Sequence, residues 1–176
     1  SALDVVRAHQ VTIVVDAWGR RQFVPLIVRR FAPIKTMECT INWLPSSGMA
    51  FSAETGSGHL LMMDGAPEGG GRNLAPRPME TLLAGAGACT AYDVVLILRK
   101  SGQTVSGCEV RLSSERAETD PKVFTKIHMH FVVRGRDLKA SMVESAIKLS
   151  HNKYCSASIM LGKTAAISHD YEIVAD

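Results

Sequence analysis

The residues best suited to covalent chemistry are four cysteines, Cys39, Cys89, Cys108 and Cys155, in a sequence of 176 residues. The thiolate is the reactive form of cysteine, and it is favoured by helix N-termini and by nearby cations. Cys155 follows Lys153 and falls near the expected start of a short helix, where free N–H groups stabilise a negative charge. From the residues alone, Cys155 is the better candidate nucleophile, with a structural role as the alternative.

Cys89 lies in an apolar segment that predicts a buried helix. A buried cysteine among alanines and leucines usually acts as a small hydrophobic residue, and Asp93, one turn later, opposes ionisation of the thiol. Reactivity at Cys89 therefore requires a cation or hydrogen-bond donors from elsewhere in the fold. Cys39 and Cys108 lie on predicted strands with no helix terminus or histidine beside them, so both are interpreted as structural.

The sequence gives weaker support for a metal site or for the catalytic triad of a serine hydrolase. His128 and His130 alternate with apolar residues, which places both on one polar face of a strand. A zinc site needs three or four ligands, and the sequence has no CxxC or HExxH motif, so exposed strand histidines are the preferred interpretation. The G-x-S-x-G elbow of serine hydrolases and the phosphate-binding glycine motifs are also missing from the sequence.

The composition is that of a globular protein, with 46% hydrophobic and 21% charged residues. A formal net charge of +3, without a basic cluster, does not favour a nucleic-acid partner. Four scattered cysteines indicate free thiols in a reducing compartment, and we expect a cytoplasmic protein. Residues 82–98 approach the length of a membrane span, but Asp93 and the many Gly and Ala residues favour a core helix, so no membrane partner is expected.

The chain is expected to divide near Met37. Residues 1–36 predict a hairpin, with a turn at residues 17–21 and an edge strand marked by Pro25. Two interpretations stay open: Met37 is an alternative start and residues 1–36 are an appended extension, or these residues are a genuine N-terminal hairpin. Residues 37–176 form the main domain in both.

The main domain is predicted to be α+β, with strands, a helix, more strands, more helices and a last strand. The expected strands are residues 39–44, 50–54, 59–63, 105–115, 123–134 and 165–174. Residues 79–100 predict a helix that is apolar all round and therefore buried all round. Residues 137–153 predict an amphipathic helix with Leu138, Met142, Ala146 and Leu149 on one face, and a second short helix is expected from Tyr154 to Gly162.

Two cysteine-containing segments resemble motifs of a known family. Residues 78–95, which include Cys89, resemble the first cysteine motif of the OsmC/Ohr family, the osmotically inducible and organic hydroperoxide resistance proteins. Residues 150–156, which include Cys155, resemble its second cysteine motif. The resemblance covers residues 37–174, is specific because both motifs occur together, and is greatest to the OsmC-like branch.

The resemblance implies an OsmC-like fold. Family members are intertwined α+β homodimers, in which a central buried helix of each subunit packs against antiparallel sheets and two active sites lie at the interface. The small residues at positions 84–88 would then let two such helices approach closely.

The resemblance also implies a reaction. Cys89 would be the peroxidatic cysteine that attacks a small organic hydroperoxide, and Cys155 would be the resolving cysteine that forms a disulfide with it. An external dithiol would restore both thiols, and no bound cofactor or metal is expected. The argument from the residues alone favours Cys155 as the stronger thiolate, so the choice between the two thiols stays open.

Active family peroxidases use an Arg and a Glu beside the thiolate, and this sequence departs from both. No Arg occurs between Met37 and Gly71, so Arg72, Arg77 or an Arg of residues 1–36 would have to substitute. The corresponding Glu80 stands about 13 Å before Cys89 along a helix, and it would act only from a folded-back loop or across a dimer. The alternative function is a non-catalytic dimer that binds an apolar ligand or partner at its interface, which the missing Arg and the Met62-Met63 pair favour.

Overall fold

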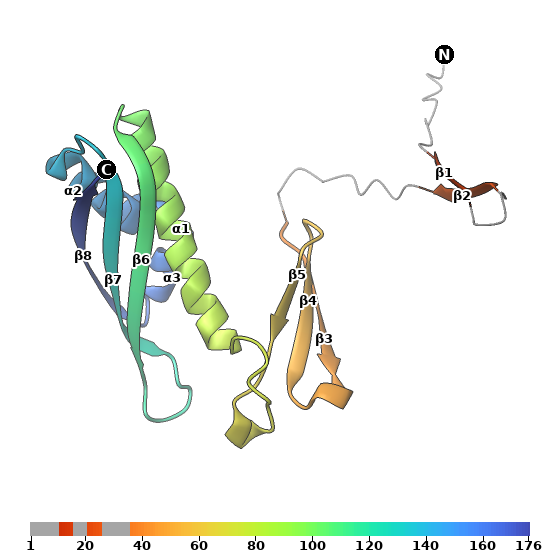
Figure 1. Cartoon of the computed structure of the whole chain (residues 1–176). Coiled ribbons are helices and arrows are strands. Elements are labelled where there is room, and N and C mark those ends of the chain that lie inside the picture. The colour runs from red at the N-terminus through yellow and green to blue at the C-terminus, as the bar shows by residue number, and fades with distance from the viewer. Residues whose placement is uncertain (1–10, 16–20, 26–35) are drawn as a thin grey trace, which may run out of the picture. The chain divides into compact units, whose positions relative to one another are not determined.

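The N-terminal part contains a two-stranded hairpin. The structure is a computed structural model that describes residues 11–15, 21–25 and 36–176 (Figure 1). Strands β1 (Val11–Val15) and β2 (Arg21–Pro25) pair in antiparallel fashion, with Val11 opposite Pro25. Of the predicted turn, residues 17–20 lie outside the described residues, and the proposed boundary at Met37 stays a prediction.

A second sheet follows, with strand order β3-β4-β5. It consists of β3 (Cys39–Leu44), β4 (Ala50–Thr55) and β5 (Leu60–Met63), which agree closely with the predicted strands. Short 3-10 turns occupy Pro45–Ser47 and Pro67–Gly69. The chain divides into two compact units, residues 1–41 with 53–61 and residues 42–52 with 62–176. All the helices and the cysteine motifs lie in the second unit.

The sheet of the second unit has the strand order β6-β7-β8. Strands β6 (Thr104–Arg116) and β7 (Phe124–Arg136) are antiparallel neighbours, as expected. Strand β8 (Ala166–Ala175) instead runs parallel to β7, with Ala166 beside Lys126, which corrects the expectation of purely antiparallel sheets. The reason is that two helices connect β7 to β8 and return the chain to the end of the sheet at which β7 begins.

Helix α1 (Pro78–Lys100) lies along this sheet, and the other helices pack against it (Figure 1). Pro78 suits the first helical position, where no N–H partner is needed, and Arg99 and Lys100 complement the dipole in the last turn. Gly87 faces β6 so closely that a Cβ atom there would lie 2.7 Å from Leu112 Cδ1. A larger residue at this position would have to displace the end of the Leu112 side chain, so packing within the chain itself favours a small residue here.

The prediction that α1 is buried all round is wrong for the single chain. Only one face is buried, and its buried residues are Ala86, Gly87, Thr90, Val94 and Leu98. On the other face Leu82 and Tyr92 are 46% and 69% exposed, because the sheet β6-β7-β8 and the later helices pack against the opposite, buried face of α1. Among the described residues α1 is also the one helix long and apolar enough to cross a bilayer, a test that core helices of soluble proteins pass as well.

The remaining helices pack on α1 and on the inner side of the sheet. Helix α2 (Ala140–Leu149) continues into a π-helical turn, Ser150–Tyr154, and then into α3 (Ser156–Leu161). The buried face of α2 carries Val143, Ala146 and Ile147, whereas Leu149 is 41% exposed, so the predicted apolar face was only partly right. The core between the layers contains apolar residues of α1, β6, β7, α2, α3 and β8, and it includes Leu98, Phe131, Val133 and Ile147.

Candidate active site

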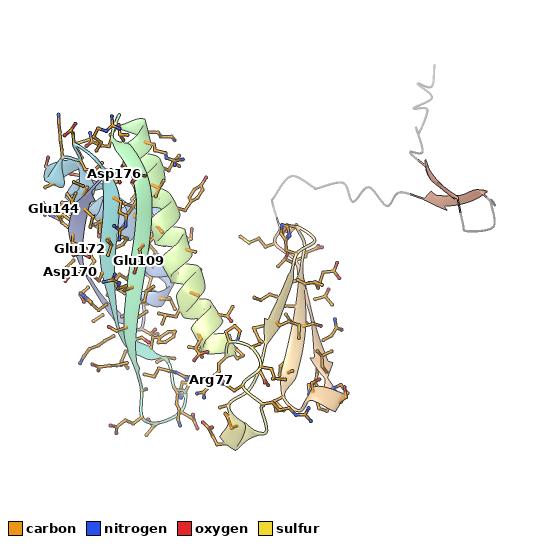
Figure 2. All side chains as sticks on the ribbon, viewed as in Figure 1. Arg77, Glu109, Glu144, Asp170, Glu172 and Asp176 are labelled. Carbon is orange, nitrogen blue, oxygen red and sulfur yellow. The ribbon has the colours of Figure 1, made fainter. Side chains whose placement is uncertain are left out.

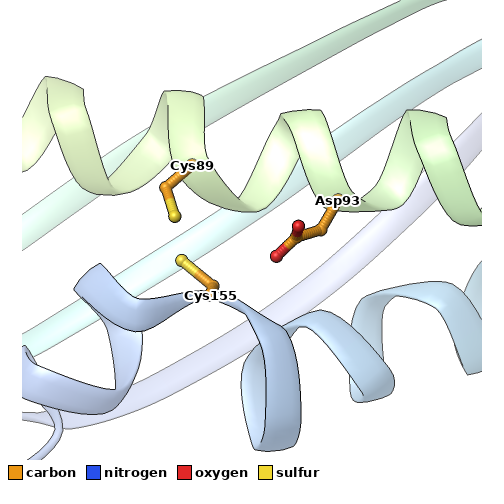
Figure 3. A group of neighbouring side chains, drawn as sticks. All are labelled: Cys89, Asp93 and Cys155. Atoms are coloured by element: carbon orange, nitrogen blue, oxygen red, sulfur yellow. The ribbon is translucent and has the colours of Figure 1, made fainter. Parts of the chain in front are cut away.

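Helix α1 places Cys89 and Asp93 on the same side. The two residues are four positions apart, which in an α-helix sets one side chain a turn above the other. Both are half-buried, so each has one side in contact with the protein and another open to solvent. This side of α1 is turned towards the segment that connects α2 to α3 (Figure 3).

Cys155 is held at the junction between the π-helical turn and α3. It is the N-cap residue of α3, and its sulfur accepts hydrogen bonds from the Ser158 N–H at 3.4 Å and from the Ser158 hydroxyl at 3.1 Å. The side chain is fully buried. The predicted position of Cys155 at the start of a short helix is therefore confirmed.

The structure brings the two sequence motifs together. The side chains of Cys89 and Cys155 point toward one another, and Asp93 extends to the same place from the next turn of α1 (Figure 3). The two sulfur atoms and a carboxylate oxygen of Asp93 all lie within 4.8 Å of one another. Both cysteines are free thiols. The sulfurs have to close by at most about 2.8 Å to reach the 2.05 Å of a disulfide bond.

A buried hydroxyl network fixes the Asp93 carboxylate. The Ser150 hydroxyl donates to Asp93 Oδ2 at 3.0 Å and lies 2.9 Å from the Thr90 hydroxyl. Ser150 is the first residue of the π-helical turn, and it has no exposed surface. The network therefore ties α1 to the segment that ends in Cys155.

The electrostatic environment of Cys89 disfavours its thiolate. Burial is the largest cause that raises the pKa of the Cys89 thiol, followed by its hydrogen bond with Cys155. A backbone N–H of Ala157 acts in the opposite direction, but the charges of Cys155 and Asp93 both raise the pKa further. At neutral pH Cys89 is accordingly a thiol for most of the time.

Glu80 lies at the other end of this stretch of α1. Its carboxylate accepts a hydrogen bond from the Arg77 N–H at 2.8 Å, at the first turn of the helix. Figure 2 shows Arg77 at this end of α1. Glu80 and Arg77 line a cavity of about 430 Å³ together with Arg116 and Phe124. Within the chain, Glu80 lies nine positions before Cys89, which sets the two about 13 Å apart along the helix axis. The catalytic role predicted for Glu80 therefore stays a prediction that needs a second subunit.

The candidate arginines are also placed by the structure. Arg72 donates its backbone N–H to the buried Asp64 carboxylate, and the Arg72 charge is one of the influences that lower the pKa of Asp64. Arg77 lines the cavity beside Glu80. Neither arginine is among the charges that shift the pKa of Cys89, which are those of Cys155 and Asp93.

His128 and His130 lie on the outer face of the sheet, as predicted. His130 Nδ1 is 2.6 Å from Asp170 Oδ1 on β8, and His128 Nδ1 is 2.8 Å from the Ser168 hydroxyl. Figure 2 shows Asp170 and Glu172 following each other along this edge of the sheet. The hydrogen bond to Asp170 is the main cause that raises the pKa of His130. The two histidines thus have partners on the neighbouring strand.

Comparison with known proteins identifies the family. A sequence model of the family described as OsmC-like protein matches residues 69–170. Protein YhfA of Escherichia coli strain K12 is 48% identical over 139 residues, which cover 79% of this chain and 99% of YhfA. The chain belongs to the OsmC-like protein family.

Solved structures agree with this OsmC-like assignment. A hypothetical protein from Aquifex aeolicus VF5 is 26% identical, with a TM-score of 0.70 over 81% of this chain and 99% of that chain. The organic hydroperoxide resistance protein OsmC of Legionella pneumophila, 15% identical, has a TM-score of 0.59 over 80% of this chain and 99% of its own. At 15% identity the second likeness concerns the fold alone.

Sequence reasoning did not find the hydrogen-bond network of Thr90, Ser150 and Asp93 beside the thiols of this OsmC-like protein. Thr90 and Asp93 are three residues apart on α1, which is a signal for a shared helix face, but their partner Ser150 is distant in the sequence. The other two cysteines lie elsewhere. Cys39 is exposed on β3 and Cys108 is half-buried on β6, where burial raises the pKa of its thiol.

Proposed function

We propose that this OsmC-like protein is a thiol-dependent peroxidase that reduces small organic hydroperoxides with Cys89 and Cys155. The observation that carries the proposal is the approach of the two sulfurs, which lie within 4.8 Å from two distant motifs. The likeness in fold to a protein described as an organic hydroperoxide resistance protein gives further support. The cytoplasm, which keeps thiols reduced, is the compartment that suits this function.

The exposure of the two cysteines assigns their roles in the proposal. Cys155 has no exposed surface, whereas Cys89 is half-buried and can meet a peroxide from solvent. The Cys89 thiolate attacks the O–O bond, so that an alcohol leaves with a proton and Cys89 becomes a sulfenic acid. The Cys155 thiol then condenses with it, water is released, and a disulfide forms. An external dithiol reduces the disulfide by thiol–disulfide exchange and is itself oxidised.

The environment of Cys89 predicts a slow reaction with peroxide. Its pKa is raised by burial, by Cys155 and by Asp93, and only the thiolate attacks a peroxide. An arginine of a partner subunit is the candidate source of the positive charge that the site needs. Glu80 carries no positive charge, and it would reach Cys89 only from that second chain.

A homodimer belongs to the same proposal. The outer face of α1 exposes Leu82 and Tyr92, and a Cβ atom added to Gly85 would have no neighbour within 4 Å. Strands β3 and β5 also expose large apolar side chains, with Trp43 at 55% and Leu60 at 75% exposure. Apolar surface of this extent in a water-soluble protein marks an interaction site. A second copy of the chain, aligned along α1, is the occupant that we propose.

The test is peroxide consumption by the reduced protein with dihydrolipoamide as reductant and cumene hydroperoxide as substrate. The wild type and Cys108→Ser should consume peroxide at the same rate, while Cys89→Ser should lose at least 100-fold of that rate. Cys155→Ser should form the sulfenic acid once without turnover. Equal rates in the wild type and Cys89→Ser would exclude the peroxidase.

One observation favours the second candidate function, binding of an apolar ligand. A groove of about 570 Å³ runs beside α1, within the size range of small-molecule sites. It is lined mainly by apolar groups, among them Ala91, Tyr92, Val95 and Val105. This function predicts ligand affinity that persists in a Cys89→Ser, Cys155→Ser double variant.

A further inference from the structure

The cysteine pair has a third neighbour that peroxidase chemistry does not need. Asp93 directs a carboxylate oxygen at the two sulfurs, and all three atoms lie within 4.8 Å of one another (Figure 3). A carboxylate at this place works against a peroxidatic thiolate, because its negative charge raises the pKa of Cys89. Two thiols and a carboxylate are, on the other hand, a favourable set of donors for a thiophilic metal ion.

We propose that Cys89, Asp93 and Cys155 form a binding site for a thiophilic divalent cation such as Zn²⁺, with a fourth coordination position open to solvent. No metal was expected from the sequence, which has no CxxC or HExxH motif. The convergence of the three residues is visible only in the folded chain.

The distances suit a small ion. Zinc–sulfur bonds of about 2.3 Å in a tetrahedron place two sulfurs about 3.8 Å apart. The three donor atoms are already within 4.8 Å, so each pair has to close by no more than about 1 Å. Cys89 and Asp93 are half-buried and lie on one face of a helix, where side-chain rotation provides such a movement without a change in the backbone.

Hydrogen bonds already orient two of the three donors. The Ser150 hydroxyl holds Asp93 Oδ2 at 3.0 Å and leaves the other carboxylate oxygen free of that bond. Ser158 directs its N–H and its hydroxyl at the Cys155 sulfur. Outer partners of this kind fix the orientation of metal ligands and strengthen binding.

The charge balance also favours a cation. The site combines one carboxylate with two groups that become anionic when they bind a metal, and the charges acting on Cys89 are both negative. A divalent cation would replace the two thiol protons, which leave to solvent, and no electrons are exchanged. The half-exposed side of Cys89 and Asp93 gives the ion an entry path, whereas Cys155 forms the closed end of the site.

Metal binding goes beyond the proposed peroxidase function and competes with it. Both sulfurs would be ligands, so the bound ion would prevent attack on a peroxide and formation of the disulfide. The two properties are tested separately, because peroxide consumption is measured with a chelator present and metal binding without peroxide.

The test is an anaerobic titration of the fully reduced protein with Co²⁺, followed by displacement with Zn²⁺. We expect one ion per chain, a thiolate-to-cobalt charge-transfer band, and the intense visible absorption of tetrahedral cobalt. Cys89→Ser and Cys155→Ser should each lose most of the charge-transfer intensity, and Asp93→Asn should weaken Co²⁺ affinity at least 10-fold. Cys108→Ser and His130→Ala are matched controls that should bind as the wild type does.

Each variant is first shown to be folded by circular dichroism and thermal unfolding. The proposal is overturned if the wild type gives no thiolate-to-cobalt band, or if the band persists in folded Cys155→Ser, or if His130→Ala abolishes it. Asp93→Asn adds a further distinction, because it should weaken metal binding and at the same time accelerate the reaction of Cys89 with peroxide. If Asp93→Asn does not weaken metal binding, the metal-site proposal fails. If it does not accelerate the reaction of Cys89 with peroxide, the peroxidase proposal fails.

Discussion

At the scale of single residues, the two thiols differ in the way that their roles require. Cys155 is enclosed and receives two hydrogen bonds from Ser158, whereas Cys89 is accessible but surrounded by groups that disfavour its charge. Cys89 thus offers the accessible sulfur, whereas the sulfur of Cys155 is buried and hydrogen-bonded. The helix terminus and the nearby Lys153 pointed to Cys155 in the sequence, which does not show that its side chain is fully buried.

The raised pKa of Cys89 predicts the pH dependence of its reactivity. Because the thiolate reacts and the pKa lies above its ordinary value, alkylation of Cys89 by iodoacetamide should still accelerate between pH 8 and about pH 9.5. Asp93→Asn should shift the profile to lower pH, since it removes one of the charges that raise the pKa, and Glu144→Gln should not. The measurement uses a Cys39→Ser, Cys108→Ser background. A profile that levels off below pH 8 would contradict it.

The pair formed by His130 and Asp170 predicts a stability optimum in weak acid. The hydrogen bond between them raises the pKa of His130 above 6.5 and lowers the pKa of Asp170 below 3.8. The contribution of His130 is complete below pH 6.5 and is lost as the pH rises through its folded pKa. The contribution of Asp170 is complete above pH 3.8 and is lost as the pH falls through its folded pKa.

Nuclear magnetic resonance of the ring protons of His130 tests this pair. The titration midpoint should lie above 6.5 in the wild type and fall in Asp170→Asn, because the main cause of the shift is then removed. Ser168→Ala, which alters only the neighbour of His128, is the control. A midpoint of His130 that does not change in Asp170→Asn would show that Asp170 is not the cause.

At the scale of elements, the site depends on the junction between α1 and the π-helical turn. Thr90, Ser150 and Asp93 connect the two segments through hydrogen bonds, and Ser150 is fully buried. A π-helical turn widens the helix at the point where it must deliver Cys155 to α1, and such irregular turns are common at functional sites.

Removal of the Ser150 hydroxyl should destabilise the protein. Ser150→Ala leaves the Thr90 hydroxyl and the Asp93 carboxylate without their shared partner, so we expect a loss of about 1–3 kcal/mol in the free energy of unfolding. The measurement is urea denaturation at fixed protein concentration. Ser113→Ala, on the exposed face of β6, is the matched control and should change the free energy of unfolding by less than about 0.5 kcal/mol. Equal effects of the two substitutions would contradict the structural role of the network.

The elements themselves were largely predictable from the sequence, and their contacts were not. Alternation along residues 123–134 and the apolar run after Pro78 predicted β7 and α1 almost to their ends. The parallel pairing of β8 depends on where α2 and α3 return the chain, which no local pattern contains. The apolar face predicted for α2 was partly wrong for a similar reason. The prediction assumed one regular helix over residues 137–153, whereas α2 spans Ala140–Leu149 and a π-helical turn follows it.

At the scale of the whole molecule, α1 is an apolar helix with one buried face and one exposed face. Its inner face packs on β6, where Gly87 allows close contact with Leu112, and its outer face exposes Leu82 and Tyr92. The family resemblance supplied the expectation of a dimer, and the composition of α1 supplied the physical reason. A single sequence does not show which face of an all-apolar helix its own chain covers.

Charge on the outer face of α1 should separate the proposed dimer. Tyr92→Glu and Leu82→Glu alter exposed side chains, so each chain should keep its fold, but desolvation of a carboxylate in an interface is costly. Size-exclusion chromatography with light scattering should report a dimer for the wild type and a monomer for the variants. Ser113→Glu, on the exposed face of β6, should remain dimeric. A wild type that is monomeric at all concentrations would contradict the dimer.

The central claim is that the sulfurs of Cys89 and Cys155 form one redox unit. The most direct measurement is mass-spectrometric mapping of the disulfides after the reduced, metal-free protein has reacted with one equivalent of cumene hydroperoxide. We expect a single new bond between Cys89 and Cys155 within one chain, and unmodified thiols at Cys39 and Cys108. Oxidation that leaves Cys89 and Cys155 unlinked, or that joins either of them to Cys39 or Cys108 instead, would contradict the account.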